Sequence, residues 1–161
     1  EAIASLVQEA VQRLGSIDFL VNNAGMGVHA SITDTTEAQF DALVNVHLKG
    51  VFFLIQRLLP LMNDGGRILN LSSGLARFAL PGYAAYAAMK GAVEVLSRYL
   101  AQELGPRGIA LNAVASYAIE TDFGGGPLLA VLLPPATRWV NAQRIEHSGG
   151  RFLCRPEVVI L

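Results

Sequence analysis

The order of its sequence patterns constrains this chain most: amphipathic helical stretches alternate with short apolar runs. Residues 1–14 repeat apolar side chains every three to four positions, and IDFLV at 17–21 follows between turn residues. RILNL at 67–71 and IALNAVA at 109–115 are two further runs of this kind. Short, continuously apolar strands are typical of a parallel sheet that is buried on both faces. The alternation therefore predicts an α/β fold with helices on both faces of a parallel sheet.

Two longer helical patterns separate these runs. Asp34 and Glu37 form a D-x-x-E helix start before an apolar pattern that extends from about 40 to 62. The second pattern covers 83–104 and is followed by a glycine and a proline. Toward the end of the chain the sequence is rich in glycine and proline, and 139–146 offers a last possible strand. The sequence thus predicts a single domain with an irregular segment before its final strand.

Charge and composition exclude several classes of partner. The net charge is -1 and the pI is about 6.3, so no long-range field favours nucleic acid or an anionic membrane surface. The apolar run at 51–62 is too short to span a bilayer and contains Gln56 and Arg57. Cys154 is the single cysteine, which excludes an internal disulfide or a thiolate metal cluster and fits a reducing compartment. We expect a cytoplasmic protein without a metal site, a nucleic-acid partner or a membrane anchor.

Tyr86 and Lys90 lie four residues apart in the second long helix and therefore share a face. A free phenol titrates near pH 10, about three units above neutrality, but a nearby ammonium stabilises the phenolate and lowers that value. Such a pair can act as an acid/base catalyst. The same spacing also arises by chance in about one chain in twenty of this composition. Tyr83 has an alanine four residues on, so we expect it to pack against a neighbouring helix.

Two polar stretches follow predicted strands and would meet at one edge of the sheet. Ser73 stands at the end of LNLSS, and NNAG at 22–25 follows the first strand. In parallel sheets this carboxyl edge binds ligands, where a serine hydroxyl can hydrogen-bond a substrate carbonyl. Each stretch also has a purely structural explanation, since SSG is a turn or helix cap and NNAG a tight turn.

Taken together, FLVNNAG, LNLSSG and YAAMK, with Ser73 thirteen residues before Tyr86, resemble the short-chain dehydrogenase/reductase family. The resemblance implies a Rossmann-type sheet and hydride transfer between NAD or NADP and a small alcohol or carbonyl substrate. By that match Tyr86 is the acid/base and Ser73 polarises the substrate oxygen. Lys90 would bind the nicotinamide ribose and lower the tyrosine pKa. The family also commonly forms oligomers through the helices that match 37–62 and 83–104.

The resemblance also assigns cofactor contacts outside this triad. The adenosine side of the cofactor would lie against the turn after the first strand, and the carboxamide and phosphates against AIETD. The residues implied are Asn22, Ala24, Gly25, Ile119 and Thr121, together with Tyr86 and Lys90.

The match covers residues 1–126 and the last strand at 139–150, with a shortened substrate-loop region at 127–138 and an unmatched tail at 151–161. The family's first strand, glycine-rich turn and first helix have no counterpart before Glu1, and the chain does not begin with Met. We therefore interpret the chain as a single incomplete domain, a partial Rossmann-type fold that lacks the first βαβ units. Because the missing turn would hold the pyrophosphate, its loss removes the main affinity for a dinucleotide.

Two further positions depart from the family. His47 replaces an asparagine that holds a water in a proton relay; imidazole can relay protons too, or the histidine is simply satisfied inside the helix layer. Ser116 and Tyr117 replace the Pro-Gly that lies against the nicotinamide ring. Two functions remain open from the sequence: an NAD(P)-dependent oxidoreductase, or an inactive fragment or degenerate paralogue that pairs with an intact subunit.

Overall fold

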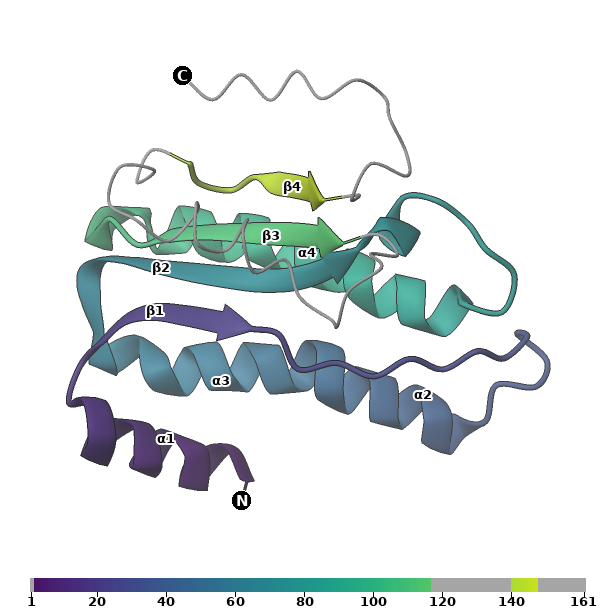
Figure 1. Cartoon of the computed structure of the whole chain (residues 1–161), viewed down its shortest axis with the longest axis horizontal. Coiled ribbons are helices and arrows are strands. Elements are labelled where there is room, and N and C mark those ends of the chain that lie inside the picture. Colours follow the sequence, from purple (N-terminus) through teal and green to yellow (C-terminus); the bar gives the residue numbers. More distant parts are fainter. Residues whose placement is uncertain (1, 117–139, 148–161) are drawn as a thin grey trace.

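The computed structural model describes residues 2–116 and 140–147, in which four parallel strands form one sheet (Figure 1). The strands follow one another across the sheet in chain order: β1 (Ile17–Asn22), β2 (Met62–Ser73), β3 (Ala110–Ser116) and β4 (Arg144–His147). All three neighbouring pairs are parallel. The predicted parallel sheet is confirmed, and the last strand begins at Arg144.

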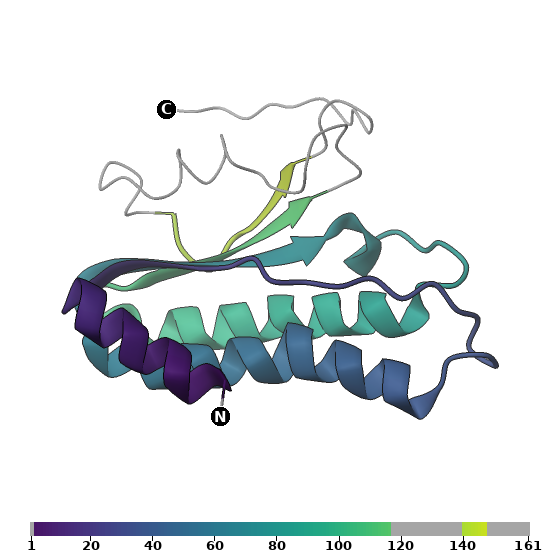
Figure 2. The ribbon, with the colours of Figure 1, turned by 60° about the horizontal axis from the view of Figure 1, so that its bottom comes forward.

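Four helices accompany the sheet in the described residues: α1 (Ala2–Leu14), α2 (Glu37–Leu43), α3 (Gly50–Leu58) and α4 (Ala84–Glu103). Figure 2 shows them all on one face of the sheet. Helices on the opposite face stay a prediction, because the remaining segments lie outside the described residues. For α2, α3 and α4 the placement follows from the strand order, since right-handed crossovers that step in one direction put their helices on the same side of the sheet.

The long helix predicted from about 40 to 62 is interrupted. A π-helical turn, Val44–Lys49, joins α2 to α3, and a short 3₁₀ turn, Leu59–Leu61, precedes β2. Met62 already pairs with Ile17 of β1, so it belongs to the sheet and not to the helix. π-helical turns inside α-helices occur frequently at functional sites.

The predicted D-x-x-E start of this helix is wrong. Thr36 is the N-cap of α2: its Oγ1 accepts from the Gln39 amide at 3.2 Å, and the Gln39 side chain accepts from the Thr36 amide at 3.0 Å. Asp34 instead accepts a hydrogen bond from the Ser31 hydroxyl in the preceding turn. A reciprocal capping box satisfies two amide donors at once, so T-x-x-Q two residues later prevails over D-x-x-E.

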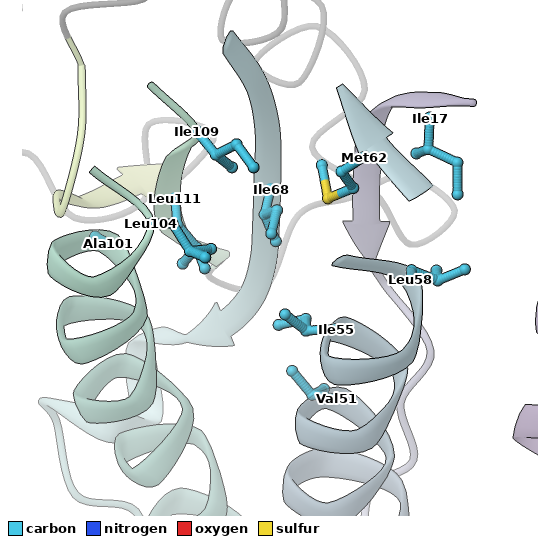
Figure 3. Close-up of a cluster of buried hydrophobic side chains, with 10 residues drawn as sticks. All are labelled: Ile17, Val51, Ile55, Leu58, Met62, Ile68, Ala101, Leu104, Ile109 and Leu111. Atoms are coloured by element: carbon cyan, nitrogen blue, oxygen red, sulfur yellow. The ribbon is translucent and has the colours of Figure 1, made fainter. Parts of the chain in front are cut away.

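The main core lies between the sheet and the helices. Ile55 and Leu58 of α3 and Leu104 after α4 belong to one buried cluster with Ile68 and Leu111 of the strands, drawn in Figure 3. Each such side chain contributes about 1.5–3 kcal/mol when it leaves water. The core therefore holds α3 and α4 against the sheet.

By length and composition, the continuous run Glu37–Leu61 could cross a membrane. In the structure, Leu43, Val51, Ile55 and Leu58 from this run are buried. One side of this run therefore packs into the core between the helices and the sheet.

Candidate active site

Ser73 lies at the carboxyl end of β2 and is 8% exposed. Its Oγ accepts from the Leu75 amide at 3.2 Å, so it also caps the 3₁₀ turn Gly74–Ala76. Its side chain also hydrogen-bonds Tyr86, which is half-buried in the first turn of α4. The structure therefore brings together the predicted serine and tyrosine, and Ser73 serves as both cap and site residue.

Lys90 is buried at 5% exposure one helical turn beyond Tyr86. Its Nζ donates to the Leu71 carbonyl at 2.7 Å and lies 5.7 Å from the centroid of the Tyr86 ring. Burial lowers the pKa of this ammonium to about 8. Lys90 is thus positioned by the strand that carries Ser73, with ammonium donors left for a further partner.

Burial raises the pKa of the Tyr86 phenol, an effect that the hydrogen bond with Ser73 opposes and the neighbouring Tyr83 reinforces. This direction contradicts the sequence-based expectation that Lys90 lowers that pKa. The ammonium lies over the face of the ring and donates to the Leu71 carbonyl, and it is not among the causes that shift the pKa of Tyr86. The phenol is therefore held as a protonated group at neutral pH.

His47 lies in the π-helical turn and is 2% exposed. Its Nε2 is 2.7 Å from the carbonyl oxygen of Met26, and its ring meets Tyr86 edge-on with centroids 5.3 Å apart. Burial lowers the pKa of the imidazole; the hydrogen bond to Met26 opposes this, and the charge of Lys90 adds to it. In the neutral tautomer that donates from Nε2 to Met26, Nδ1 is a buried acceptor for which the structure shows no partner. His47 therefore lies beside Tyr86 in the candidate site, and its part in a proton relay stays a prediction.

The turn after β1 reaches the same edge of the sheet. The Asn22 amide is buried and donates to Asn70 Oδ1 at 2.7 Å, so its side chain ties β1 to β2. Ala24 and Gly25 are exposed beyond it. A Cβ on Gly25 would stand 3.2 Å from Cε1 of His47, which explains a glycine against this ring. Backbone groups of the turn are thus open to a ligand, whereas the Asn22 side chain is already used.

Tyr83 was expected to pack against a neighbouring helix, and the ring contacts that the structure shows for it are with His29 of a loop and with Tyr86. Tyr83 is the N-cap of α4, and its ring meets His29 edge-on at a centroid distance of 4.9 Å. A backbone hydrogen bond from Ala30 to Gly82 at 2.9 Å holds these two loops together. Tyr83 therefore stands beside Tyr86 at the rim of the site, with ring centroids 6.4 Å apart.

Sequence reasoning missed one charged pair near the site. Glu94 accepts from the Ser72 hydroxyl and from Arg144 Nε, each at 2.6 Å. Glu94 follows Tyr86 and Lys90 at eight and four residues, so its helical spacing was a usable signal. Its partner Arg144 lies fifty positions further along the sequence, in β4. Ile119, Thr121 and Tyr117, which the resemblance placed beside the cofactor, lie outside the described residues.

Taken together, Ser73, Tyr86 and Lys90 lie at the carboxyl edge of a Rossmann-type parallel sheet, the edge at which α/β proteins of this class bind their ligands. A family model described as enoyl-(acyl carrier protein) reductase matches residues 1–150. The chain belongs to the short-chain dehydrogenase/reductase family.

Curated relatives and solved structures agree with this assignment. The chain is 42% identical over 161 residues to 3-oxoacyl-(acyl-carrier-protein) reductase FabG of Thermotoga maritima, covering 99% of this chain and 62% of the relative. It is 32% identical to a short-chain type dehydrogenase/reductase of Picea abies, covering 92% and 66%. The chain thus spans about two thirds or less of the length of these relatives.

Two solved structures show the same fold. A short-chain dehydrogenase/reductase from Serratia marcescens matches with a TM-score of 0.86 at 30% identity, over 92% of this chain and 72% of the other. A blue fluorescent protein from a metagenomic library, in complex with NADPH, matches with a TM-score of 0.86 at 31% identity, over 92% and 70%.

Proposed function

We propose that this chain is part of an NAD(P)-dependent oxidoreductase that interconverts a small carbonyl compound and its alcohol. One observation carries the proposal: Ser73, Tyr86 and Lys90 converge where β2 ends beside α4, with Lys90 bonded to the strand that carries Ser73. Separate structural explanations for each residue do not account for this convergence.

The residues present fit the nicotinamide-ribose half of the cofactor. Lys90 uses one donor on the Leu71 carbonyl and has further donors for ribose hydroxyls. The exposed backbone at Ala24 and Gly25 offers a surface for the adenosine side, where Asn22 acts through the strand that it fixes. By the family match, Ile119 and Thr121 would complete the carboxamide and phosphate contacts.

When bound, the cofactor supplies or accepts a hydride at the carbonyl carbon. Ser73 Oγ donates a hydrogen bond to the carbonyl oxygen, and the protonated Tyr86 phenol transfers its proton to that oxygen as it becomes an alcohol. The raised pKa of Tyr86 suits this direction because it keeps the proton on the phenol until the oxygen gains charge. By the family match, His47 would hold a water for the proton relay, and its Nδ1, which has no partner in the described residues, is the atom able to bind it.

We also propose that two copies associate through the helical layer of residues 37–62 and 83–104. Exposed apolar side chains gather on these helices, each at least 38% exposed: Phe40, Phe52, Phe53, Val95 and Tyr99. Exposed apolar area of this kind marks association surfaces. A cytoplasmic location fits the single cysteine and the near-neutral charge.

The activity is tested by following oxidation of NADPH or NADH in the presence of a panel of small ketones and aldehydes. We expect carbonyl-dependent oxidation that falls by about a hundredfold or more in Tyr86→Phe, because the proton donor is lost. Tyr83→Phe is the matched control and should retain the rate. Equal rates in Tyr86→Phe and the parent would refute the assignment, and absence of carbonyl-dependent oxidation would favour the inactive-paralogue alternative.

A further inference from the structure

Helix α4 is joined to the end of β2 at four successive strand residues. Ser97 accepts from Asn70 at 2.9 Å, and Lys90 donates to the Leu71 carbonyl. The next two contacts are those of Ser72 with Glu94 and of Ser73 with Tyr86. Figure 1 shows α4 running behind β2 and β3. The serine and tyrosine of the site are therefore aligned by a series of polar contacts that begins well away from them.

Glu94 is the one charged acceptor in this series. Its Oε1 receives both the Ser72 hydroxyl and Arg144 Nε at 2.6 Å, and its side chain is only 13% exposed. A carboxylate at this depth is costly without a counter-charge, and Arg144 supplies it. Glu94 and Arg144 thus form a largely buried ion pair. Ser72 also binds the Glu94 carboxylate, and the Ser73 carbonyl also contacts Arg144.

Arg144 extends the alignment to a second strand. It projects from β4, which pairs with β3 and not with β2, and its Nη2 lies 3.4 Å from the Ser73 carbonyl oxygen. Its side chain is 20% exposed. Through this one residue, the strand end that carries Ser73 is connected both to the helix that carries Tyr86 and to β4.

We infer that Glu94 and Arg144 are positioning residues that set the approach of the Ser73 hydroxyl to the Tyr86 phenol. Neither touches the reacting atoms. They act through Ser72 and through the Ser73 backbone. Where it concerns catalysis, this inference rests on the proposed function. The contacts themselves are present in this chain whether or not it turns over a substrate.

The test distinguishes a change in how Ser73 meets Tyr86 from a general loss of folding stability. Glu94→Leu removes the carboxylate that Ser72 and Arg144 share and should destabilise the fold, whereas Glu94→Leu/Arg144→Met removes both charges and should recover stability. Ser97→Ala is the matched control, because it breaks the Asn70 contact of the same series at the end far from Ser73. Unfolding by urea ranks the stability of all four proteins.

Alignment is measured by NMR titration of tyrosine Cζ, with the Tyr86 signal assigned through Tyr86→Phe. The hydrogen bond with Ser73 lowers the pKa of Tyr86, so its loss should raise that pKa. The other titratable groups around the phenol are His47, Tyr83 and Lys90, which all variants retain. We expect the pKa to rise in Glu94→Leu, which has no acceptor for the Ser72 hydroxyl, and to stay raised in the double variant after its stability has recovered, while Ser97→Ala titrates like the parent.

A double variant whose Tyr86 titrates like the parent would overturn the inference, as would a Ser97→Ala protein whose titration shifts equally. This readout does not require turnover, so it stands or falls separately from the proposed activity. In a preparation that turns over, kcat should fall about tenfold or more in the double variant with little change in KM for the cofactor.

Discussion

The burial of His47 predicts how the stability of the fold changes at acidic pH. Its Nδ1 is buried and has no hydrogen-bond partner in the described residues, and burial lowers the pKa of the imidazole in the folded chain. Below about pH 6.5 the unfolded chain therefore binds a proton that the native chain resists, and stability falls as pH decreases. Urea unfolding at neutral pH and near pH 5 should show this loss in the parent but much less of it in His47→Asn. An equal acid loss in both proteins would contradict the buried neutral imidazole.

Lys90 should affect the stability of the fold at alkaline pH. Its pKa is lowered from 10.5 to about 8 by burial. Between these values the unfolded chain holds a proton that the native chain has released, so this residue makes stability rise with pH. Relative to Lys90→Met, the parent should gain roughly 2–3 kcal/mol between about pH 8 and pH 10.5, measured by urea unfolding. A constant difference between the two proteins across that window would contradict the buried ammonium.

At the scale of elements, the start of α2 depends on Thr36. Its reciprocal bonds with Gln39 satisfy amides that the helix leaves without partners. Thr36→Ala should lower the free energy of unfolding by about 1 kcal/mol. Thr33→Ala, in the exposed turn before the helix, is the control and should change it by less than about half as much. If the two substitutions cost the same, Thr36 is not the cap.

How far the elements could be predicted depends on how local their causes are. β1, β2, β3 and α4 follow from apolar runs and helical spacing, and Tyr86 with Lys90 follows from that same spacing. The π-helical turn around His47 could not be predicted because no residue pattern in the helix marks it.

Two features of the site required the folded chain. The direction of the Tyr86 pKa depends on burial and on where Lys90 Nζ points, and neither is encoded in a four-residue spacing. The ion pair of Glu94 joins residues fifty positions apart. Sequence spacing could place Glu94 on the face of Tyr86 but could not supply its partner.

At the scale of the molecule, the helical layer carries several exposed apolar side chains. Tyr99 of α4 is 65% exposed, with Val95 one turn before it. If two copies associate there, Tyr99→Asp places a charge in the interface and should shift the population toward monomer in sedimentation velocity. Leu14→Asp, at a similarly exposed position at the end of α1, is the control and should associate like the parent. The proposed interface is wrong if Tyr99→Asp leaves the association unchanged.

Cofactor binding measures whether this chain holds a nicotinamide cofactor beside Tyr86. NADPH and NADH fluorescence would be titrated against the 161-residue chain and against Lys90→Met. The account predicts saturable binding of at least one cofactor, weakened about tenfold or more in Lys90→Met because the ammonium donors to the ribose are lost. The absence of saturable binding by the parent chain, or equal binding by both proteins, would contradict it.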